Sequence, residues 1–144
     1  MPRPHEGGNK STRNGRWGEA VAVEHLRCEG YEIIGRNVRP CARDRRLEID
    51  VIAYDRLTEI AVFVEVKQHR TRDARSTRLR SVTRRKTELL RRACRCWLLR
   101  NKWETGYRFD VIEVYGSPGE RPEIDHVERV RLFEKTERFV RWDA

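Results

Sequence analysis

The sequence has few cysteines, no zinc-type cysteine spacing and no long apolar run. Its four cysteines are Cys28, Cys41, Cys94 and Cys96, and nothing in the sequence implies a secreted context, so we expect reduced thiols. No apolar run approaches the roughly 18 residues that span a membrane, and no segment resembles a signal peptide. Internal repeats and low-complexity segments are also missing. We therefore expect a soluble, cytoplasmic protein with no membrane partner.

Acidic residues are scarce in one segment only. Residues 68–100 carry twelve basic groups and two acidic ones, a net charge of +10, whereas residues 1–67 carry +1 and residues 101–144 carry −2. Codon bias could explain why Arg outnumbers Lys, but it does not explain why acids are missing here. A basic block favours a phosphate-binding surface, and the alternative is a solvated, Arg-rich helix. The predicted DNA contacts are Arg70, Arg72, Arg84, Arg85 and Lys86.

The length of 144 residues fits one domain. We expect a disordered basic tail at 1–14, a domain at 15–133 and a C-terminal tail at 134–144. Periodicity and turn residues predict helices at 16–29 and 81–100, and strands at 31–39, 47–54, 59–67, 107–115 and 124–132. The second helix is a crossover long enough for parallel pairing of the strands on either side of it. The sequence thus predicts an α/β domain.

The strand at 59–67 ends with a carboxylate and an ammonium group on one face. Side chains alternate along a strand, so Glu65 and Lys67 share the face of Phe63, while the valines line the other face. An acid in apolar surroundings rarely remains without a partner. Glu65 therefore needs a proton or a positive charge nearby.

The preceding strand carries a second acid into the same region. Alternation predicts one face made of Leu47, Ile49, Val51 and Ala53, with Asp50 on the other face. A hairpin centred between residues 57 and 58 places Asp50 opposite Glu65, where two charges about 5 Å apart repel by about 3 kcal/mol at an effective dielectric of 20. A proton on one acid, a pairing with Lys67 or a divalent cation could offset this repulsion.

Two carboxylates beside a lysine form a site that suits Mg²⁺, with Mn²⁺ as an alternative. Mg²⁺ prefers oxygen ligands and commonly takes one or two protein carboxylates together with substrate phosphate. A lysine at this position could orient a water molecule or stabilise negative charge on phosphorus. These residues point to metal-dependent hydrolysis of a phosphodiester bond.

The order of the motifs resembles a known family. Asp50 followed by Glu65-Val66-Lys67 resembles the PD-(D/E)xK nuclease signature, and the chain from 15 to 133 is similar to the YraN-like family of uncharacterised bacterial proteins. The matching motifs are Gly15-Arg16-Trp17-Gly18-Glu19-Ala20, Asn37, Glu48-Ile49-Asp50, Phe63-Val64-Glu65-Val66-Lys67, Lys86 and Arg108-Phe109-Asp110. Leu47 departs from the family's usual glycine, and Gln68-His69 departs from its usual Thr-Arg.

The resemblance implies a restriction-endonuclease-like fold, similar to that of Holliday junction resolvases. Such a fold has three α/β/α layers, a central mixed sheet and the core order αβββαβ. By that similarity Glu19, Asp50 and Glu65 are acidic catalytic residues and metal ligands, and Lys67 is the catalytic lysine. A homodimer is plausible because junction substrates are two-fold symmetric.

Three functions remain open from the sequence. The leading one is a Mg²⁺-dependent endonuclease that cleaves DNA, with branched or otherwise structured DNA as the favoured substrate. The alternative is a non-catalytic DNA-binding accessory protein with the same fold, and a protein-partner adaptor is weaker. Some individual residues have structural alternatives: an ion pair for Glu48, and a cap or a pairing with Arg108 for Asp110. For His69 a proton carrier near the site is one alternative, and an exposed loop position is the favoured one.

Overall fold

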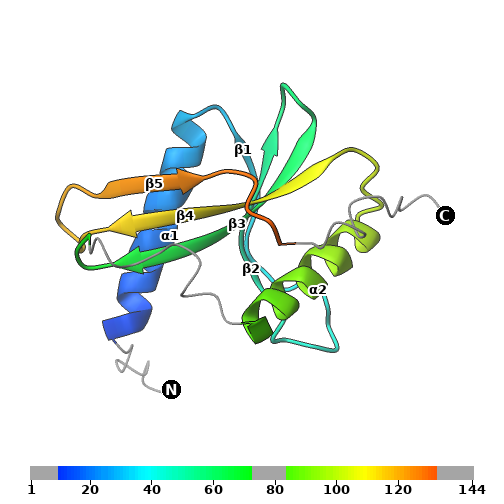
Figure 1. Cartoon of the computed structure of the whole chain (residues 1–144), viewed down its shortest axis with the longest axis horizontal. Helices are drawn as coiled ribbons and strands as arrows, with labels where there is room; N and C mark the ends of the chain where they lie inside the picture. The colour runs from blue at the N-terminus through cyan, green and yellow to red at the C-terminus, as the bar shows by residue number, and fades with distance from the viewer. Residues whose placement is uncertain (1–9, 73–83, 133–144) are drawn as a thin grey trace, which may run out of the picture.

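Two helices, one followed by three strands and the other by two, make up the computed structural model, which describes residues 10–72 and 84–132 (Figure 1). The elements are α1 (Lys10–Cys28), β1 (Glu32–Val38), β2 (Ile49–Asp55), β3 (Ile60–His69), α2 (Arg84–Arg100), β4 (Tyr107–Tyr115) and β5 (Glu123–Val127). The predicted order and type of the elements are confirmed, although α1 begins at Lys10, earlier than expected. The C-terminal tail at 134–144 and most of the N-terminal tail lie outside the described residues.

The strands form one mixed sheet in the order β1-β2-β3-β4-β5. β3 and β4 are parallel and joined through α2, as predicted, and the other neighbouring pairs are antiparallel. β5 is shorter than the predicted strand because its pairing with β4 ends at Val127, and Arg129 then takes a left-handed backbone conformation with φ 55°. The result is an α/β fold with a five-stranded sheet.

The two helices cover opposite faces of the sheet, as alternation along β3 requires. Val62 and Val64 belong to the hydrophobic cluster that contains the α1 residues Ala22, Val23 and Leu26. Phe63 lies between them in sequence and belongs to the other cluster, together with the α2 residues Leu90, Ala93, Cys94, Trp97 and Leu98. Phe63 and Trp97 meet edge to face, with ring centroids 5.5 Å apart. The predicted faces of β3 are confirmed.

For β2 the predicted face is wrong in part. Val51 and Ala53 pack on the α1 side, whereas Leu47 and Ile49 belong to the α2-side cluster. Leu47 precedes the strand and lies in a turn in which its amide donates to the carbonyl of Asp44 at 3.2 Å. Ile49 is the first strand residue. The alternation of side chains between the two faces applies within a strand, so it does not fix the faces of these two residues.

Helix α1 ends where the sequence predicts a stop. Gly30 has φ 93°, its amide donates to the carbonyl of Arg27, and the amide of Tyr31 donates to the carbonyl of Leu26, both at 3.0 Å. These two bonds are the Schellman motif, which satisfies carbonyls left open at a helix end. Within the described ranges, neither helix has the length and apolar character needed to span a lipid bilayer.

Candidate functional site

The candidate site lies where β2 and β3 separate. Pairing between these strands runs from Asp55 and Ile60 to Val51 and Val64, and β3 then continues to His69 paired with β4. This is the predicted hairpin register, and its next step brings Asp50 opposite Glu65. The amide of Val66, just past the end of the pairing, donates to Asp50 Oδ2 at 2.9 Å. The Asp50 side chain therefore accepts a hydrogen bond from β3 where the β2–β3 pairing ends.

The two acids are close enough to share a proton. The Glu65 carboxyl is almost fully buried, with 5% of the residue exposed, and Asp50 is half-buried. Burial and then the charge of Glu65 raise the pKa of Asp50 to about 8, and a hydrogen bond between the two carboxyl groups acts in the same direction. This raised pKa favours a proton on one of the two acids, which is one of the three predicted ways to offset their repulsion.

Two lysines bind the same oxygen of Glu65. Lys67 Nζ lies 3.4 Å from Glu65 Oε1, and Lys86 Nζ lies 2.8 Å from it. Burial and the neighbouring Lys86 lower the pKa of Lys67. Burial opposes the charge on Lys86, but its bonds to Glu65 and Lys67 outweigh this and raise its pKa. Lys86, predicted from the sequence as a DNA contact, therefore belongs to the acid pair in this structure.

Glu19 of α1 lies within electrostatic reach of the acid pair. Burial raises its pKa, a hydrogen bond with Asn37 lowers it, and the charges of Glu48 and Glu65 raise it. Asn37 lies opposite Asp50 in the β1–β2 register and has φ 48°, a conformation that Asn tolerates better than most residues. The sequence identifies Asn37 only as a motif residue, and the structure adds its hydrogen bond with Glu19.

The acids do not form a preformed three-ligand metal cage. Across residues 10–72 and 84–132, no group of three or more His, Cys, Asp or Glu side chains is arranged to hold a metal ion. Asp50 and Glu65 are thus the two oxygen donors that the structure brings together, with Glu19 beside them. Glu48 forms an exposed ion pair with Arg39 at 3.4 Å, as its structural alternative predicted.

Gly18 explains how α1 reaches this end of the sheet. A Cβ atom at this position would lie 2.8 Å from Gln68 Oε1 and 3.2 Å from Gln68 Cβ. The absence of a side chain lets α1 approach β3 closely, and Glu19 follows directly. The glycine in the N-terminal motif therefore has a packing role that places the neighbouring acid.

A further buried acid lies on the lysine face. Glu113 pairs in register with Lys67 and is only 1% exposed, with its carboxylate 3.2 Å from the donating Tyr115 hydroxyl and 3.4 Å from His69 Nε2. His69 belongs to β3 and stacks on Tyr115, so the expected exposed loop position is wrong. Glu113 was missed because the register of a parallel pair joined by a crossover cannot be read from the sequence.

The predicted DNA contacts differ in their surroundings. Arg70 is exposed at the end of β3. Arg72 is bonded to Glu123 and Asp125 at 3.0 Å each and lies over the ring of Tyr115. The side chains of Arg84 and Arg85 lie outside the described part of the chain.

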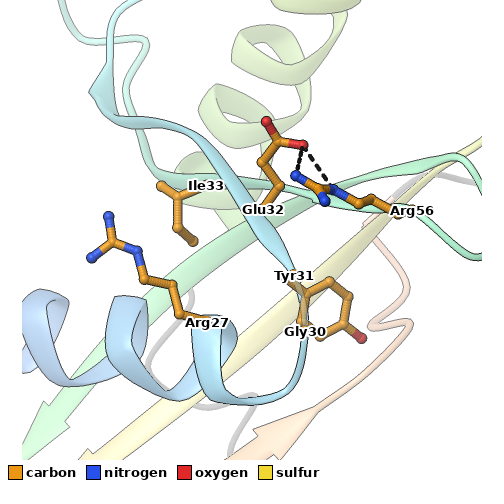
Figure 2. Close-up of a pocket in the computed structure, with 6 residues that line it drawn as sticks. All are labelled: Arg27, Gly30, Tyr31, Glu32, Ile33 and Arg56. Atoms are coloured by element: carbon orange, nitrogen blue, oxygen red, sulfur yellow. Dashed lines mark hydrogen bonds and ion pairs between the residues drawn. The ribbon is translucent and has the colours of Figure 1, made fainter.

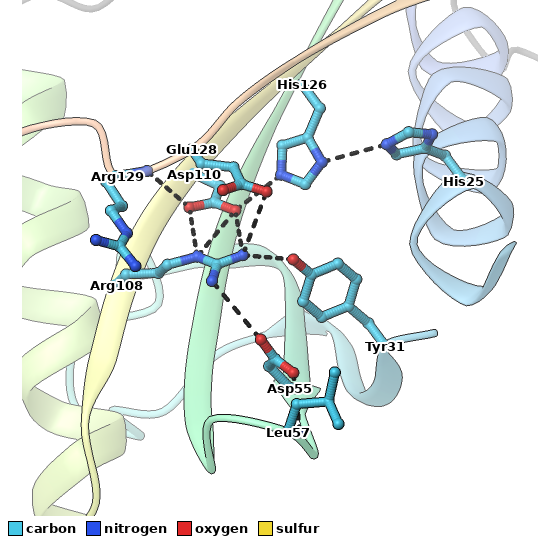
Figure 3. A network of polar contacts seen from close by, with 9 residues as sticks. All are labelled: His25, Tyr31, Asp55, Leu57, Arg108, Asp110, His126, Glu128 and Arg129. Atoms are coloured by element: carbon cyan, nitrogen blue, oxygen red, sulfur yellow. Dashed lines mark hydrogen bonds and ion pairs between the residues drawn. The ribbon is translucent and has the colours of Figure 1, made fainter. Parts of the chain in front are cut away.

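A separate polar network lies on the α1 side of the sheet (Figure 3). Arg108 Nε donates to Asp110 Oδ1 at 3.1 Å, so the predicted pairing of these residues is confirmed. Asp110 is fully buried and also contacts His126 Nε2 at 2.8 Å. The other ring nitrogen of His126 lies 3.2 Å from Nε2 of His25 on α1. This network joins β4, β5 and α1, and it contains none of the acids of the candidate site.

A surface pocket of about 420 Å³ lies beyond the end of α1 (Figure 2). It is lined by Arg27, Gly30, Tyr31, Glu32, Ile33 and Arg56. Arg56 is paired with Glu32 at 3.1 Å. None of the predicted site residues lines this pocket, so it is distinct from the acid pair.

Comparison with known proteins places the chain in a family. The model of "Uncharacterised protein family UPF0102" matches residues 18–114. UPF0102 proteins of Mycobacterium bovis and Mycobacterium tuberculosis are 41% identical over 121 residues, which cover 81% of this chain and 90% of each relative. A UPF0102 protein of Mycobacterium avium is 41% identical over 118 residues, covering 81% of this chain and 88% of the relative. The chain therefore belongs to the UPF0102 family, the YraN-like family that its motifs resemble.

Proposed function

We propose that this protein is a Mg²⁺-dependent endonuclease that cleaves phosphodiester bonds in DNA, with branched or structured DNA as the favoured substrate. The observation that carries the proposal is the pairing of Asp50 with Glu65 where β2 and β3 separate, with Lys67 beside Glu65. The order α-β-β-β-α-β and the helices on both faces of the sheet agree with a restriction-endonuclease-like fold. Fold alone does not give an activity, so the proposal depends on the site.

The donor set fits a divalent cation. Burial and then the charge of Glu65 raise the pKa of Asp50 to about 8, and a divalent cation between the two carboxyl groups would favour their ionised forms. Two carboxylates match the preference of Mg²⁺ for oxygen ligands. When bound, the ion would polarise a phosphate oxygen and lower the pKa of water. Asp50 and Glu65 are the residues that would hold it.

The lysines supply the remaining chemistry. Lys67 is 12% exposed at its side chain, and its lowered pKa makes its neutral form more accessible than that of an ordinary lysine. A neutral amine here can accept a proton from an attacking water molecule, and its charged form can stabilise negative charge on phosphorus. Lys86 stays charged and holds Glu65 in place from α2.

The proposal is tested by incubating labelled four-way junctions, flaps and linear duplexes with the protein in Mg²⁺ or Mn²⁺. We expect cleavage of at least one branched substrate by the wild type and a loss of about 100-fold or more in Lys67→Ala, because charge stabilisation of this kind contributes about that factor. Lys102→Ala, an exposed lysine outside the site, is the matched control and should cleave normally. Equal cleavage by wild type and Lys67→Ala, or none by either, would contradict the proposal.

One observation favours a non-catalytic DNA-binding protein with the same fold. Glu65 is already neutralised by two ammonium groups, so the cluster could be purely structural. In that case DNA binding would be the same in EDTA and in Mg²⁺. Asp50→Asn and Glu65→Gln would also behave like the wild type in cells. A nuclease instead requires both carboxylates, and Glu104→Gln serves as the exposed control.

A further inference from the structure

The loop between β1 and β2 docks on one face of α2 through a short series of polar contacts. Arg100 Nη1 donates to the carbonyl of Pro40 at 2.7 Å, and the Cys96 thiol donates to the same carbonyl at 3.5 Å. One turn earlier on the helix, Arg92 lies 3.9 Å from Asp44. Residues 92, 96 and 100 are four apart and so lie on one helix face.

This docking brings two half-exposed thiols together. Cys41 directly follows Pro40, whose carbonyl accepts the Cys96 thiol, so the docked loop places the two thiols beside each other. The two residues are far apart in sequence, so their contact joins the loop to the helix. In contrast, Cys94 is fully buried and Cys28 is exposed at the end of α1.

The two sulfurs have different surroundings. Cys41 lies in a turn closed by a hydrogen bond from the Asp44 amide to the Cys41 carbonyl at 3.3 Å. The backbone amides of Arg43 and Asp44 lower the pKa of Cys41, whereas burial and the neighbouring thiol raise the pKa of Cys96. A thiol with a lower pKa is the better nucleophile near neutral pH. This difference favours Cys41 as the attacking thiol and Cys96 as the resolving one.

We propose that Cys41 and Cys96 form a reversible oxidation site that a peroxide converts to a disulfide. The Cys41 thiolate attacks one peroxide oxygen, the O–O bond breaks, and the leaving hydroxide takes up the thiol proton as water. The resulting Cys41 sulfenic acid is attacked by the Cys96 sulfur, the S–O bond breaks, and a second water leaves with the Cys96 proton. Two thiols lose two electrons in total, and the peroxide gains them. The disulfide closes a loop that contains β2 and β3 and fixes it to α2.

The site is independent of the proposed nuclease activity and is tested on the whole protein. Fully reduced protein is treated with hydrogen peroxide, blocked with an alkylating reagent and digested with trypsin without reductant. Cleavage after Arg95 separates Cys94 from Cys96, so a Cys41–Cys96 disulfide joins peptide 37–43 to peptide 96–100. We expect this linked peptide, an intact mass lower by two hydrogens, and reversal of both by dithiothreitol.

Three variants make the outcome decisive. Cys96→Ser should stop at the Cys41 sulfenic acid, which a dimedone probe traps, and Cys41→Ser should give neither product. Cys28→Ser should form the linked peptide like the wild type. Oxidation should also move the urea midpoint of the wild type upward and leave that of Cys96→Ser unchanged. Oxidation that is confined to Cys28, or a linked peptide that contains Cys94 in place of Cys96, would overturn the proposal.

Discussion

At the scale of single residues, the surroundings of Asp50 disfavour its charged form. Its carboxylate accepts the Val66 amide and faces Glu65, and its pKa is raised to about 8. Charged groups that their surroundings disfavour are typical of functional sites. At such sites, residues needed for activity often reduce the stability of the fold. Asn37, which is hydrogen-bonded to Glu19, also lowers the stability of the fold locally, because its backbone takes a left-handed conformation.

We predict that Asp50→Asn raises the stability of the metal-free protein at pH 8 by about 1–3 kcal/mol, since one pKa unit corresponds to about 1.4 kcal/mol. The folded protein holds a proton on Asp50 that the unfolded chain releases near pH 3.8, so wild-type stability falls as pH rises from about 4 to about 8. Asparagine can still accept the Val66 amide but does not titrate.

Urea unfolding in EDTA at pH 5 and pH 8 measures this effect. The fall in unfolding free energy between the two pH values should be smaller in Asp50→Asn than in the wild type, while Glu104→Gln should follow the wild type. A variant that is less stable than the wild type at pH 8 would show that the ionised carboxylate stabilises the fold.

At the scale of elements, the strands were the most predictable part of the chain. β4 begins and ends at the predicted residues, and the hairpin register that pairs Asp50 with Glu65 follows from a tight turn and strict alternation. Alternation failed at Leu47 and Ile49, which lie before and at the start of β2. Lys86 was predicted as a DNA contact and not as a partner of Glu65, and Glu113 was not predicted, because the placement of α2 and the register of β4 depend on packing between segments distant in sequence.

Gly15 within α1 and Gly30 just after it should respond in opposite directions to the same substitution. Gly30→Ala should cost about 1–2 kcal/mol, because alanine resists the left-handed conformation that ends the helix. Gly15→Ala should instead stabilise the protein by up to about 1 kcal/mol, because alanine favours the helix interior. A Cβ atom meets nothing within 4 Å at either position, so packing does not interfere. Thermal unfolding of both variants checks the prediction, and equal shifts of the two midpoints would contradict it.

The contact between α1 and β5 should weaken in mild acid. Burial, and then the charge of His126, lowers the pKa of His25, with Glu29 acting in the opposite direction. Below about pH 6.5 the His25 side chain of the unfolded chain binds a proton, whereas that of the folded protein does so only at lower pH. The free energy of unfolding therefore decreases as the pH falls through this window.

His25→Gln isolates this contribution, because glutamine can donate to His126 without titrating. The difference in unfolding free energy between variant and wild type should shift in favour of the variant from pH 7.5 to pH 5.5. Hydrogen exchange of α1 at the two pH values provides a local measurement. If the difference in unfolding free energy did not change with pH, protonation of His25 would not affect its contact with His126.

At the scale of the whole molecule, positive charge and the acid pair belong to neighbouring elements. The net +10 segment, residues 68–100, begins at the end of β3 and includes α2, whose Lys86 reaches Glu65. A phosphate group bound beside Lys86 would thus approach the acids. The homodimer suggested by the resemblance to junction resolvases stays a prediction, which light scattering of the purified protein can test.

DNA binding should depend strongly on salt, and its arginines should contribute unequally. About six phosphate contacts give a slope of log affinity against log salt near −5. Arg70→Ala should reduce the size of this slope by about 1. Arg72→Ala should change it little, because Glu123 and Asp125 already neutralise this guanidinium. Fluorescence anisotropy over a series of salt concentrations measures both slopes, and a larger change for Arg72→Ala would contradict the assignment.

The central claim is that Asp50 and Glu65 together form a cation site, and calorimetric titration with Mg²⁺ and Mn²⁺ tests it without any choice of substrate. We expect saturable binding by the wild type and by Glu104→Gln, and a loss of binding in both Asp50→Asn and Glu65→Gln. Circular dichroism confirms that each variant is folded. Unchanged binding in the two site variants, or no binding by the folded wild type, would contradict the claim.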